Sequence, residues 1–495
     1  MRTMRAVATV AIGCAAGLFG AVTVEGLGGC WPLALLGFLA VGAAVGSWVW
    51  RGRLGTFVPD QCPRALKIGS LIATIVGLVQ LARLAVFIID PTQVNASILP
   101  SSEWERRHSC VSSYYVAAEA IDRTPNVYDD ALYSIANPDP AAPRKPRLLD
   151  GFRVDVYEYP TPFLLLPRAV DVAASDFLHF RSIWFGLNGS AALLALLAVA
   201  SLLAPAVRTR ALLYAPLVFA AFPFGSVLQK GNAQILVIAL AMLAMVLFDR
   251  RRYALGGVLL AFAMVSKLYP GMLVVYLLAR RDWRAVGWTI AWSMALVVAS
   301  ILDTGWAPLA AFLAHLPRLL GGEAFPAFKN PAAVAINYSI PGLVLKLKLF
   351  GVPAMSFAIS KLVGWVYTLA VVATTIVLAR REREATRVTV WLAILILATL
   401  RSPFLPQAYA GYPPVWLLTL LAAMAVPSPR VLALVLATWL GLNIFVAMDW
   451  SIDPRWMSLI VAVPQTIAIA LTIRALYAED VSAHPPRINK EKFHG

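Results

Sequence analysis

Long apolar segments separated by short polar loops occupy most of the chain. They lie at residues 6–27, 31–50, 68–89, 183–203, 212–227, 233–248, 254–266, 272–278, 286–303, 357–379, 388–400, 415–425, 431–447 and 459–476. A helix needs about 20 apolar residues to cross a bilayer perpendicular to its plane. The pattern therefore predicts an all-α polytopic membrane protein with about 12–14 transmembrane helices, a range that reflects the possibility of re-entrant segments.

Several of these apolar segments are shorter than a perpendicular crossing requires. The clearest examples are residues 233–248, 254–266 and 272–278. A helix that does not cover the full thickness of the hydrocarbon must end against protein or water, because lipid cannot satisfy its free backbone groups. We therefore expect the short helices to end at a cavity.

Basic residues in the short loops predict the orientation of the chain. The sequence is 60% hydrophobic and 14% charged, with a formal net charge of +16. Arginine clusters follow apolar segments at residues 250–252, 280–284 and 380–383. Such loops normally stay in the cytoplasm. We therefore infer that the positive charge sets the orientation of the helices in the membrane and does not form a nucleic-acid-binding surface. We predict a multi-pass protein of the cytoplasmic (inner) membrane.

This orientation divides the chain into four parts. They are an N-terminal transmembrane hairpin at 1–60, a core at 61–350, C-terminal transmembrane helices at 351–478 and a cytoplasmic tail at 479–495. The core contains a large external loop at 90–181, in which we predict an amphipathic helix at 111–121 and a Pro-rich stretch at 137–146. A second external loop is predicted at 304–338.

Polar and ionisable side chains collect on the predicted outer face. They are Asp90, Glu103, Glu105, Asp155, Lys230, Asn232, Gln234, Lys267, His315, Lys329, Asn330, Asn337 and Arg401. Lys267 closes an apolar segment, where an ionisable group is costly unless it is paired, lines a watery cavity or meets a ligand. The alternative is that Lys267 extends to the lipid headgroups. Because the short cytoplasmic loops contain no glycine-rich phosphate-binding motif, we expect any chemistry on the external face.

Carboxylates beside cations suit the transfer of a group from a lipid phosphate. A carboxylate can accept a proton, and a cation can neutralise a phosphate leaving group. For each such residue the alternative is a loop side chain that faces water. The four cysteines, Cys14, Cys30, Cys62 and Cys110, have no metal-ligand spacing, and no metal site is predicted. Cys30 and Cys110 could both lie outside and could form a disulfide.

Four short stretches follow one another in order within residues 68–339. They are YYVAA at 114–118 with YD at 128–129 beyond it, YPTPFLLLP at 159–167, GNAQ at 231–234 and KLYP at 267–270, with NYS at 337–339 as a weaker fifth. In this order and on the predicted outer face, they resemble motifs of the polyprenol-phosphate-dependent glycosyltransferases of the GT-C fold. Among these enzymes they are most similar to family 87, which is bacterial α-mannosyltransferase-like.

The resemblance implies an enzyme that acts outside the cytoplasmic membrane. Such an enzyme would move a sugar, with mannose the first expectation and arabinofuranose the second, from a polyprenyl-phosphate donor to a glycolipid or cell-envelope glycan. Its partners would be the lipid-linked donor, the acceptor and membrane lipids, with no nucleic acid and no cofactor beyond the donor itself. The alternative functions are a transporter or flippase of a lipid-linked substrate and a noncatalytic GT-C-like envelope scaffold.

The catalytic base is the point at which this chain departs from the family pattern. Family members carry an aspartate a few residues before the tyrosine-bearing helix, whereas residues 108–113 here read HSCVSS. Either the base has moved or the chain is a divergent member. The candidates for a displaced base are Asp90, Glu103, Glu105 and Asp155. His108 could also accept a proton near neutral pH.

The remaining candidates have binding roles. Lys267, Arg401 and Lys230 are predicted to bind the donor phosphate. Contacts with the sugar or the acceptor are predicted for Asn232, Gln234, Tyr159, Tyr115 and Asn337. The two amides at the start of their apolar segment could instead cap its helix. The tyrosines could instead belong to an aromatic belt at the membrane interface.

Overall fold

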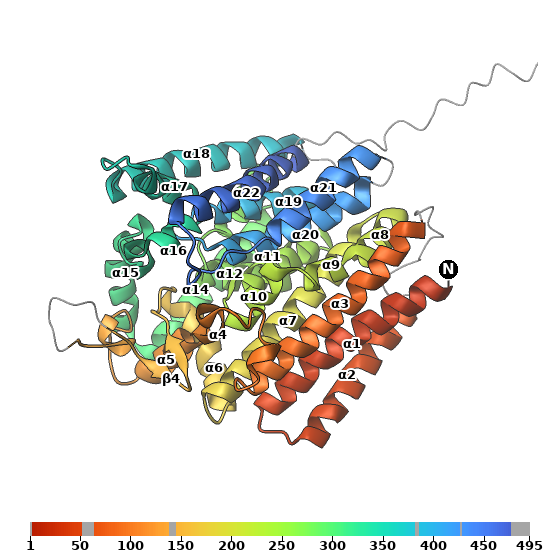
Figure 1. Ribbon diagram of the computed structural model, residues 1–495, viewed down its shortest axis with the longest axis horizontal. Helices are drawn as coiled ribbons and strands as arrows, with labels where there is room; N and C mark the ends of the chain where they lie inside the picture. Colours follow the sequence, from red (N-terminus) through yellow and green to blue (C-terminus); the bar gives the residue numbers. More distant parts are fainter. Residues whose placement is uncertain (1, 52–63, 138–144, 382–385, 426–427, 477–495) are drawn as a thin grey trace, which may run out of the picture.

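Helices make up most of the computed structural model, which describes residues 2–51, 64–137, 145–381, 386–425 and 428–476 (Figure 1). Among the described helices, eight are long and apolar enough to cross a membrane. They are α1 (Arg2–Gly26), α2 (Trp31–Trp50), α3 (Arg64–Ile89), α7 (Phe177–Leu202), α14 (Trp283–Thr304), α18 (Phe357–Arg381), α20 (Gln407–Ala425) and α22 (Pro454–Leu476). The prediction of an all-α polytopic membrane protein is confirmed. The predicted tail at 479–495 lies outside the described residues.

Shorter apolar helices pack among these spans. They are α11 (Gln234–Asp249), α12 (Tyr253–Ser266), α13 (Gly271–Ala279), α19 (Arg387–Thr399) and α21 (Pro429–Leu442). The sequence predicted about 12–14 crossings. Within the described part of the chain, this number is reached only when the short helices, and the bent pair of helices at 205–219 and 222–230, are counted together with the eight long helices.

The segment predicted as one span at residues 212–227 is divided into three helices. They are α8 (Pro205–Tyr214), α9 (Pro216–Phe219) and α10 (Phe222–Lys230). The chain bends by 58° before α10. Pro216 and Pro223 each stand in the first turn of a helix, where a missing backbone N–H breaks no intrahelical hydrogen bond. The bend is invisible to hydropathy because both sides of it are apolar.

Contacts between helix ends gather arginine-bearing loops at one end of the bundle. Arg387 at the start of α19 pairs with Asp249 at the end of α11. Arg280 after α13 donates to the carbonyl of Ala379 near the end of α18. α11 and α12 form an antiparallel hairpin whose connecting loop lies at this arginine-rich end. The start of α11 and the end of α12, next to Lys267, therefore lie at the opposite end of the bundle. The predicted orientation would therefore put this far end outside the membrane.

The described residues of 90–137 and 145–176 form a polar module at one end of the bundle (Figure 1). Its elements are η1 (Val94–Ala96), α4 (Glu103–Arg107), β1 (His108–Ser109), α5 (Val111–Ala120), η2 (Asp130–Leu132), β2 (Ser134–Ile135), β3 (Lys145–Pro146), β4 (Leu148–Leu149), β5 (Phe152–Val154), η3 (Thr161–Leu164) and α6 (Leu165–Ala173). The predicted helix at 111–121 is present as α5, but most of its side chains are buried, so it is not amphipathic. Residues 138–144 of the Pro-rich stretch lie outside the described chain.

A small sheet brings two distant segments of the module together. Strand β5 pairs in parallel with β1 and antiparallel with β4. The register places Ser109 opposite Val154. As a result, the turn that leads from β1 into α5 lies beside the loop that follows β5. These two segments carry His108, Cys110 and Asp155.

The second external loop, predicted at 304–338, contains helical structure that hydropathy did not indicate. The helices that follow α14 are α15 (Trp306–Gly321), η4 (Pro326–Lys329), α16 (Pro331–Ala335), α17 (Ile340–Lys346) and η5 (Leu347–Phe350). His315, Pro317 and Arg318 interrupt the apolar run of α15 and lower its hydropathy. α15 and η4 contribute part of the wall of the cavity described next.

Candidate active site

A cavity of about 770 Å³, called the pocket below, lies between the polar module and the membrane helices. Its polar wall includes Trp104, Glu105, His108, Cys110, Asp155, Glu158, Tyr159, Lys230, Asn232, Gln234, Lys267, Arg401 and Tyr409. Its apolar wall includes Phe312, Leu319, Phe325, Trp365, Val371, Phe404 and Met448. The helices α11, α12 and α13 each have one end at this pocket, as their short lengths predicted, and α10 also ends there.

Gly231 shapes the turn from α10 into α11 that delivers two amides to the pocket. Its backbone has φ = +67°, a conformation that glycine adopts without the steric cost other residues meet. A side chain would also collide with the module, since an added Cβ would lie 2.0 Å from Cγ2 of Val111. The Gly231 carbonyl accepts a hydrogen bond of 2.7 Å from Nε1 of Trp184. The turn is therefore held between the module and α7.

We expect Gly231→Ala to lower the thermal stability of the detergent-solubilised protein more than Gly151→Ala does. Gly151 also has a positive φ, but an added Cβ there meets nothing within 4 Å. Both substitutions carry a backbone cost of roughly 1–2 kcal/mol. Only Gly231→Ala adds overpacking, which typically costs about 1–3 kcal/mol. Equal shifts in the unfolding temperature of the two variants would contradict the close approach of Val111.

Lys267 carries a charge that no carboxylate among the described residues neutralises by a direct ion pair. Its Nζ donates to Oδ1 of Asn232 and to Oε1 of Gln234, both at 3.0 Å. It also lies 5.6 Å from the centre of the Tyr159 ring. Asn232 Oδ1 in addition accepts the backbone N–H of Gln234, so this amide caps the start of α11 and holds the lysine. The positive charge remains available to an anion in the pocket.

Lys230, in contrast, is neutralised by Glu105. The two side chains form a buried ion pair of 2.6 Å, with exposed fractions of 5% and 1%. Ser226 donates to the second carboxylate oxygen at 3.0 Å, and Gln229 donates to the Glu105 backbone carbonyl at 2.8 Å. Both charged groups line the pocket. However, the two oxygens of the Glu105 carboxylate already accept hydrogen bonds from Lys230 and Ser226, so this carboxylate is not free to take a proton from a substrate. Lys230 is likewise not a free cation for phosphate.

Asp90 and Glu103 lie outside the pocket lining. The Asp90 carboxylate accepts hydrogen bonds from Thr92 and Gln93, which hold its pKa below the usual range. The Glu103 carboxylate lies 3.4 Å from a guanidinium nitrogen of Arg153. The structure therefore places neither of these predicted base candidates in the pocket lining.

Asp155 lies in the pocket with 39% of its side chain exposed. One carboxylate oxygen lies 3.8 Å from Nε2 of His108, and the other accepts the backbone N–H of Val156 at 3.1 Å. The surrounding protein desolvates this carboxylate and raises its pKa to about 6. Each oxygen atom of the Asp155 carboxylate thus already contacts a nitrogen atom of the module, one on His108 and one on Val156.

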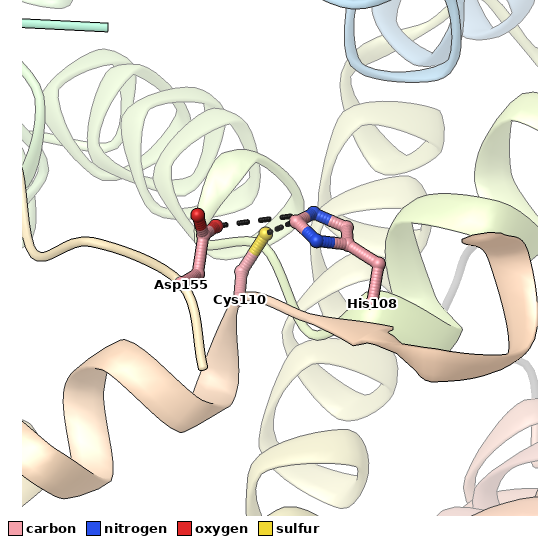
Figure 2. A group of neighbouring side chains, drawn as sticks. All are labelled: His108, Cys110 and Asp155. Atoms are coloured by element: carbon pink, nitrogen blue, oxygen red, sulfur yellow. Dashed lines mark hydrogen bonds and ion pairs between the residues drawn. The ribbon is translucent and has the colours of Figure 1, made fainter. Parts of the chain in front are cut away.

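His108 on β1 and Cys110 directly before α5 face Asp155 (Figure 2). The Cys110 sulfur lies 3.7 Å from Nε2 of His108 and 3.0 Å from the Tyr409 hydroxyl. Burial, with the positive charges of Lys230 and Arg153, lowers the pKa of His108 to about 3. His108 is therefore neutral near pH 7 and is a poor base.

Cys110 does not form the disulfide that its expected position allowed. Cys30 and Cys110 are both free cysteines. Cys30 is exposed just before α2, whereas Cys110 is 3% exposed and lies at the pocket. Burial raises the pKa of the Cys110 thiol to about 12, so it is protonated at neutral pH.

Glu158 is a pocket carboxylate that the sequence reasoning missed. No hydrogen bond or ion pair links its carboxylate to another of the described residues, so both oxygens are available. Burial, with the negative charges of Asp155 and Asp130, raises the pKa of Glu158 well above its usual value, and Lys267 opposes this shift. The sequence feature that could have identified Glu158 as a site residue is its position immediately before the YPTPFLLLP stretch.

Arg401 brings a second cation to the pocket. Its Nε donates to the Thr368 hydroxyl at 2.8 Å, and its guanidinium lies 5.6 Å from the centre of the Trp365 ring. Gly364 on α18 leaves room for this group, because a Cβ there would lie 2.8 Å from Cζ of Arg401. The guanidinium thus stands where the polar wall meets aromatic and apolar side chains.

The predicted sugar-binding residues divide between the pocket and the protein interior. Tyr159 lines the pocket, and its hydroxyl accepts a hydrogen bond of 2.8 Å from Tyr114. Tyr115 packs instead against Phe177 and Phe180, outside the pocket lining.

Asn337 is also placed away from the pocket lining. It is fully buried, and its Oδ1 accepts the backbone N–H of Leu405 at 2.9 Å. Its Nδ2 donates to the carbonyl of Pro403 at 3.3 Å. Asn337 therefore shapes the loop that follows Arg401 and is absent from the pocket lining.

Comparison with known proteins assigns the chain to a family. The model of glycosyltransferase family 87 matches residues 157–403, about half of the chain. The matched range contains Glu158, Lys267 and Arg401. No curated protein and no solved structure matches the chain. The polytopic helical fold, the pocket at the ends of its short helices and this match together show that the chain belongs to glycosyltransferase family 87.

Proposed function

We propose that this glycosyltransferase transfers a sugar from a polyprenyl-phosphate donor to a glycolipid or cell-envelope glycan at the outer face of the cytoplasmic membrane. Mannose is the first expectation for the sugar, and arabinofuranose is the alternative. The observation that carries the proposal is the presence of two unpaired, opposite charges in one pocket. Glu158 has an available carboxylate, and Lys267 has no carboxylate partner within ion-pair distance among the described residues.

The proposed reaction is a single displacement at the anomeric carbon. The acceptor hydroxyl oxygen forms a bond to this carbon while the bond from the carbon to the phosphate oxygen breaks. Glu158 takes the proton of the acceptor hydroxyl. The bonding electrons leave with the polyprenyl phosphate, and Lys267 and Arg401 stabilise its developing negative charge. Asn232 and Gln234 keep the lysine in place through their side-chain oxygens.

The apolar wall of the pocket supports a donor with a hydrocarbon chain. Phe312 and Leu319 of α15, Phe325 before η4 and Trp365 of α18 all line it. Arg401 lies at the boundary between this wall and the polar one. A polyprenyl phosphate has the same division, with an anionic head joined to an apolar chain, whereas a water-soluble nucleotide sugar does not.

The test is sugar transfer by the purified full-length protein. Radiolabelled polyprenyl-phosphate mannose and polyprenyl-phosphate arabinofuranose are supplied in parallel with membrane glycolipids, and a nucleotide-activated mannose serves as the control donor. We expect label in the glycolipid fraction from a polyprenyl-phosphate donor, mannose above all, and none from the nucleotide. Folded protein that transfers from neither lipid donor would favour the transporter or scaffold alternatives.

A further inference from the structure

We propose that His108, Cys110 and Asp155 form a binding site for a divalent transition-metal ion, most suitably zinc. The three side chains offer one nitrogen, one sulfur and one oxygen ligand, and these atoms all lie within 4.8 Å of one another (Figure 2). The mixed set of imidazole, thiolate and carboxylate is typical of zinc. Its ligands come from segments 45 residues apart in the chain, so cysteine spacing gave no sign of it.

The distances from His108 to the other two ligand atoms agree with one shared cation. His108 Nε2 lies 3.7 Å from the Cys110 sulfur and 3.8 Å from the Asp155 oxygen. Bond lengths of about 2.0–2.3 Å to a tetrahedral zinc separate its ligand atoms by roughly 3.4–3.6 Å. Side-chain movements of a few tenths of an ångström would therefore bring these two pairs of ligand atoms to the separations that zinc requires.

The directions of approach argue against a nucleophilic triad built from the same residues. In such a triad the thiol faces one imidazole nitrogen and the carboxylate orients the other. Here the Cys110 sulfur and the Asp155 carboxylate both approach Nε2 of His108. One nitrogen cannot accept the thiol proton and be oriented by the carboxylate at the same time. Three ligand atoms within 4.8 Å of one another are close enough to share a metal ion placed between them.

Neighbouring side chains complete the surroundings of a metal site. The Tyr409 hydroxyl and Nδ2 of Asn232 lie 3.0 and 3.4 Å from the Cys110 sulfur, and as donors they would stabilise a metal-bound thiolate. His108 stacks on Trp104 with ring centres 4.7 Å apart, which fixes the imidazole plane.

Three protein ligands leave a coordination position that can face the pocket, as in catalytic rather than structural zinc sites. A cation there would supply a Lewis acid to a hydroxyl group bound beside Glu158. This catalytic role rests on the proposed function, whereas metal binding itself does not.

The experiment measures metal binding by the full-length protein, purified with a tag that contains no histidine and stripped with a chelator. Equilibrium dialysis against zinc followed by elemental analysis is expected to give one zinc per chain. Cobalt in place of zinc is expected to show a thiolate-to-cobalt charge-transfer band that Cys110→Ala abolishes. His108→Ala and Asp155→Ala are expected to weaken zinc binding by more than the roughly 10–100-fold typical of losing an outer-shell partner.

Matched variants control for other cysteines and histidines. Cys30→Ser removes an exposed cysteine, and His179→Ala removes a histidine paired with Asp176 away from the pocket. Neither is expected to change zinc binding. Tyr409→Phe keeps the ring but removes a donor to the sulfur, and we expect a decrease in affinity of about tenfold.

Two results would overturn the inference. One is a parent protein that retains no zinc, and the other is equal zinc binding by the parent and Cys110→Ala. The outcome is separable from that of the proposed function. A protein that transfers sugar but binds no zinc overturns only the metal site. A protein that binds zinc through these three residues but transfers from neither lipid donor overturns only the proposed function.

Discussion

Glu158→Gln is expected to slow sugar transfer by roughly 10²–10⁴-fold, the usual effect of losing a positioned general base. Glutamine keeps the size and polarity of the side chain but cannot accept the acceptor's proton as a carboxylate does. The dissociation constant of the donor is expected to change little, because the phosphate-binding cations remain in place. Single-turnover transfer rates and equilibrium binding of the labelled donor measure the two quantities separately.

Two other carboxylates provide the comparison for this variant. Glu103→Gln changes a carboxylate outside the pocket lining and is expected to leave the transfer rate unchanged. Asp155→Asn changes a second carboxylate of the module that lines the pocket, next to His108. Abolished transfer in Asp155→Asn combined with a parent-like rate in Glu158→Gln would contradict the assignment of Glu158 as the base.

The pH dependence of transfer gives an independent test of the same role. Burial and the negative charges of Asp155 and Asp130 raise the pKa of Glu158, while Lys267 lowers it, and the net shift is upward. Only the deprotonated form can act as a base. The parent rate should therefore fall as the pH decreases through this raised pKa, well above the usual range of a glutamate. The residual rate of Glu158→Gln should lack this acidic limb.

Lys267→Met is expected to reduce the rate of transfer by roughly 10²–10³-fold, a loss typical of removing one group that stabilises charge in a transition state. Methionine preserves much of the length and apolar character of the side chain but removes the charge. Donor affinity should also decrease, because the phosphate is charged before the reaction begins. Initial rates over a range of donor concentrations, together with donor binding, separate these two effects.

Other lysines serve as controls for the loss of charge. Lys329 lies at the end of η4, is exposed and is absent from the pocket lining, so Lys329→Met should transfer at the parent rate. Lys230→Met should instead reduce thermal stability, because it leaves Glu105 buried without its counter-ion. A parent-like rate in Lys267→Met would contradict the role of this lysine in leaving-group stabilisation.

Local patterns in the sequence predicted the parts of the site that lie close together in the chain. Asn232, Gln234 and Lys267 stand at the two ends of one antiparallel hairpin. The basic loop between α11 and α12 already indicated that these ends share a side of the membrane. Their meeting in the pocket follows from the nearly equal lengths of the two helices.

Long-range packing decided the parts that sequence patterns did not predict. Glu105 and Lys230 both looked like free charges, and nothing local indicates that residues 125 positions apart form a buried pair. The pairing of β1 with β5 brings His108 to Asp155, yet these strands are only two and three residues long. Glu158 lies in a loop, where neither periodicity nor spacing separates a pocket residue from a solvated one.

The short helices that end at the pocket also bear on the depth at which the proposed reaction would take place. α11 has 16 residues and α12 has 14. At about 1.5 Å per residue they rise roughly 24 and 21 Å, less than the roughly 30 Å thickness of a bilayer's hydrocarbon core. In the predicted orientation, with the basic ends of both helices at one membrane surface, Lys267 would stand several ångströms beneath the other surface. Depth would then act as a filter for the donor, since a lipid phosphate on a single flexible chain can sink to this level, whereas the headgroup of a two-chain phospholipid stays at the interface.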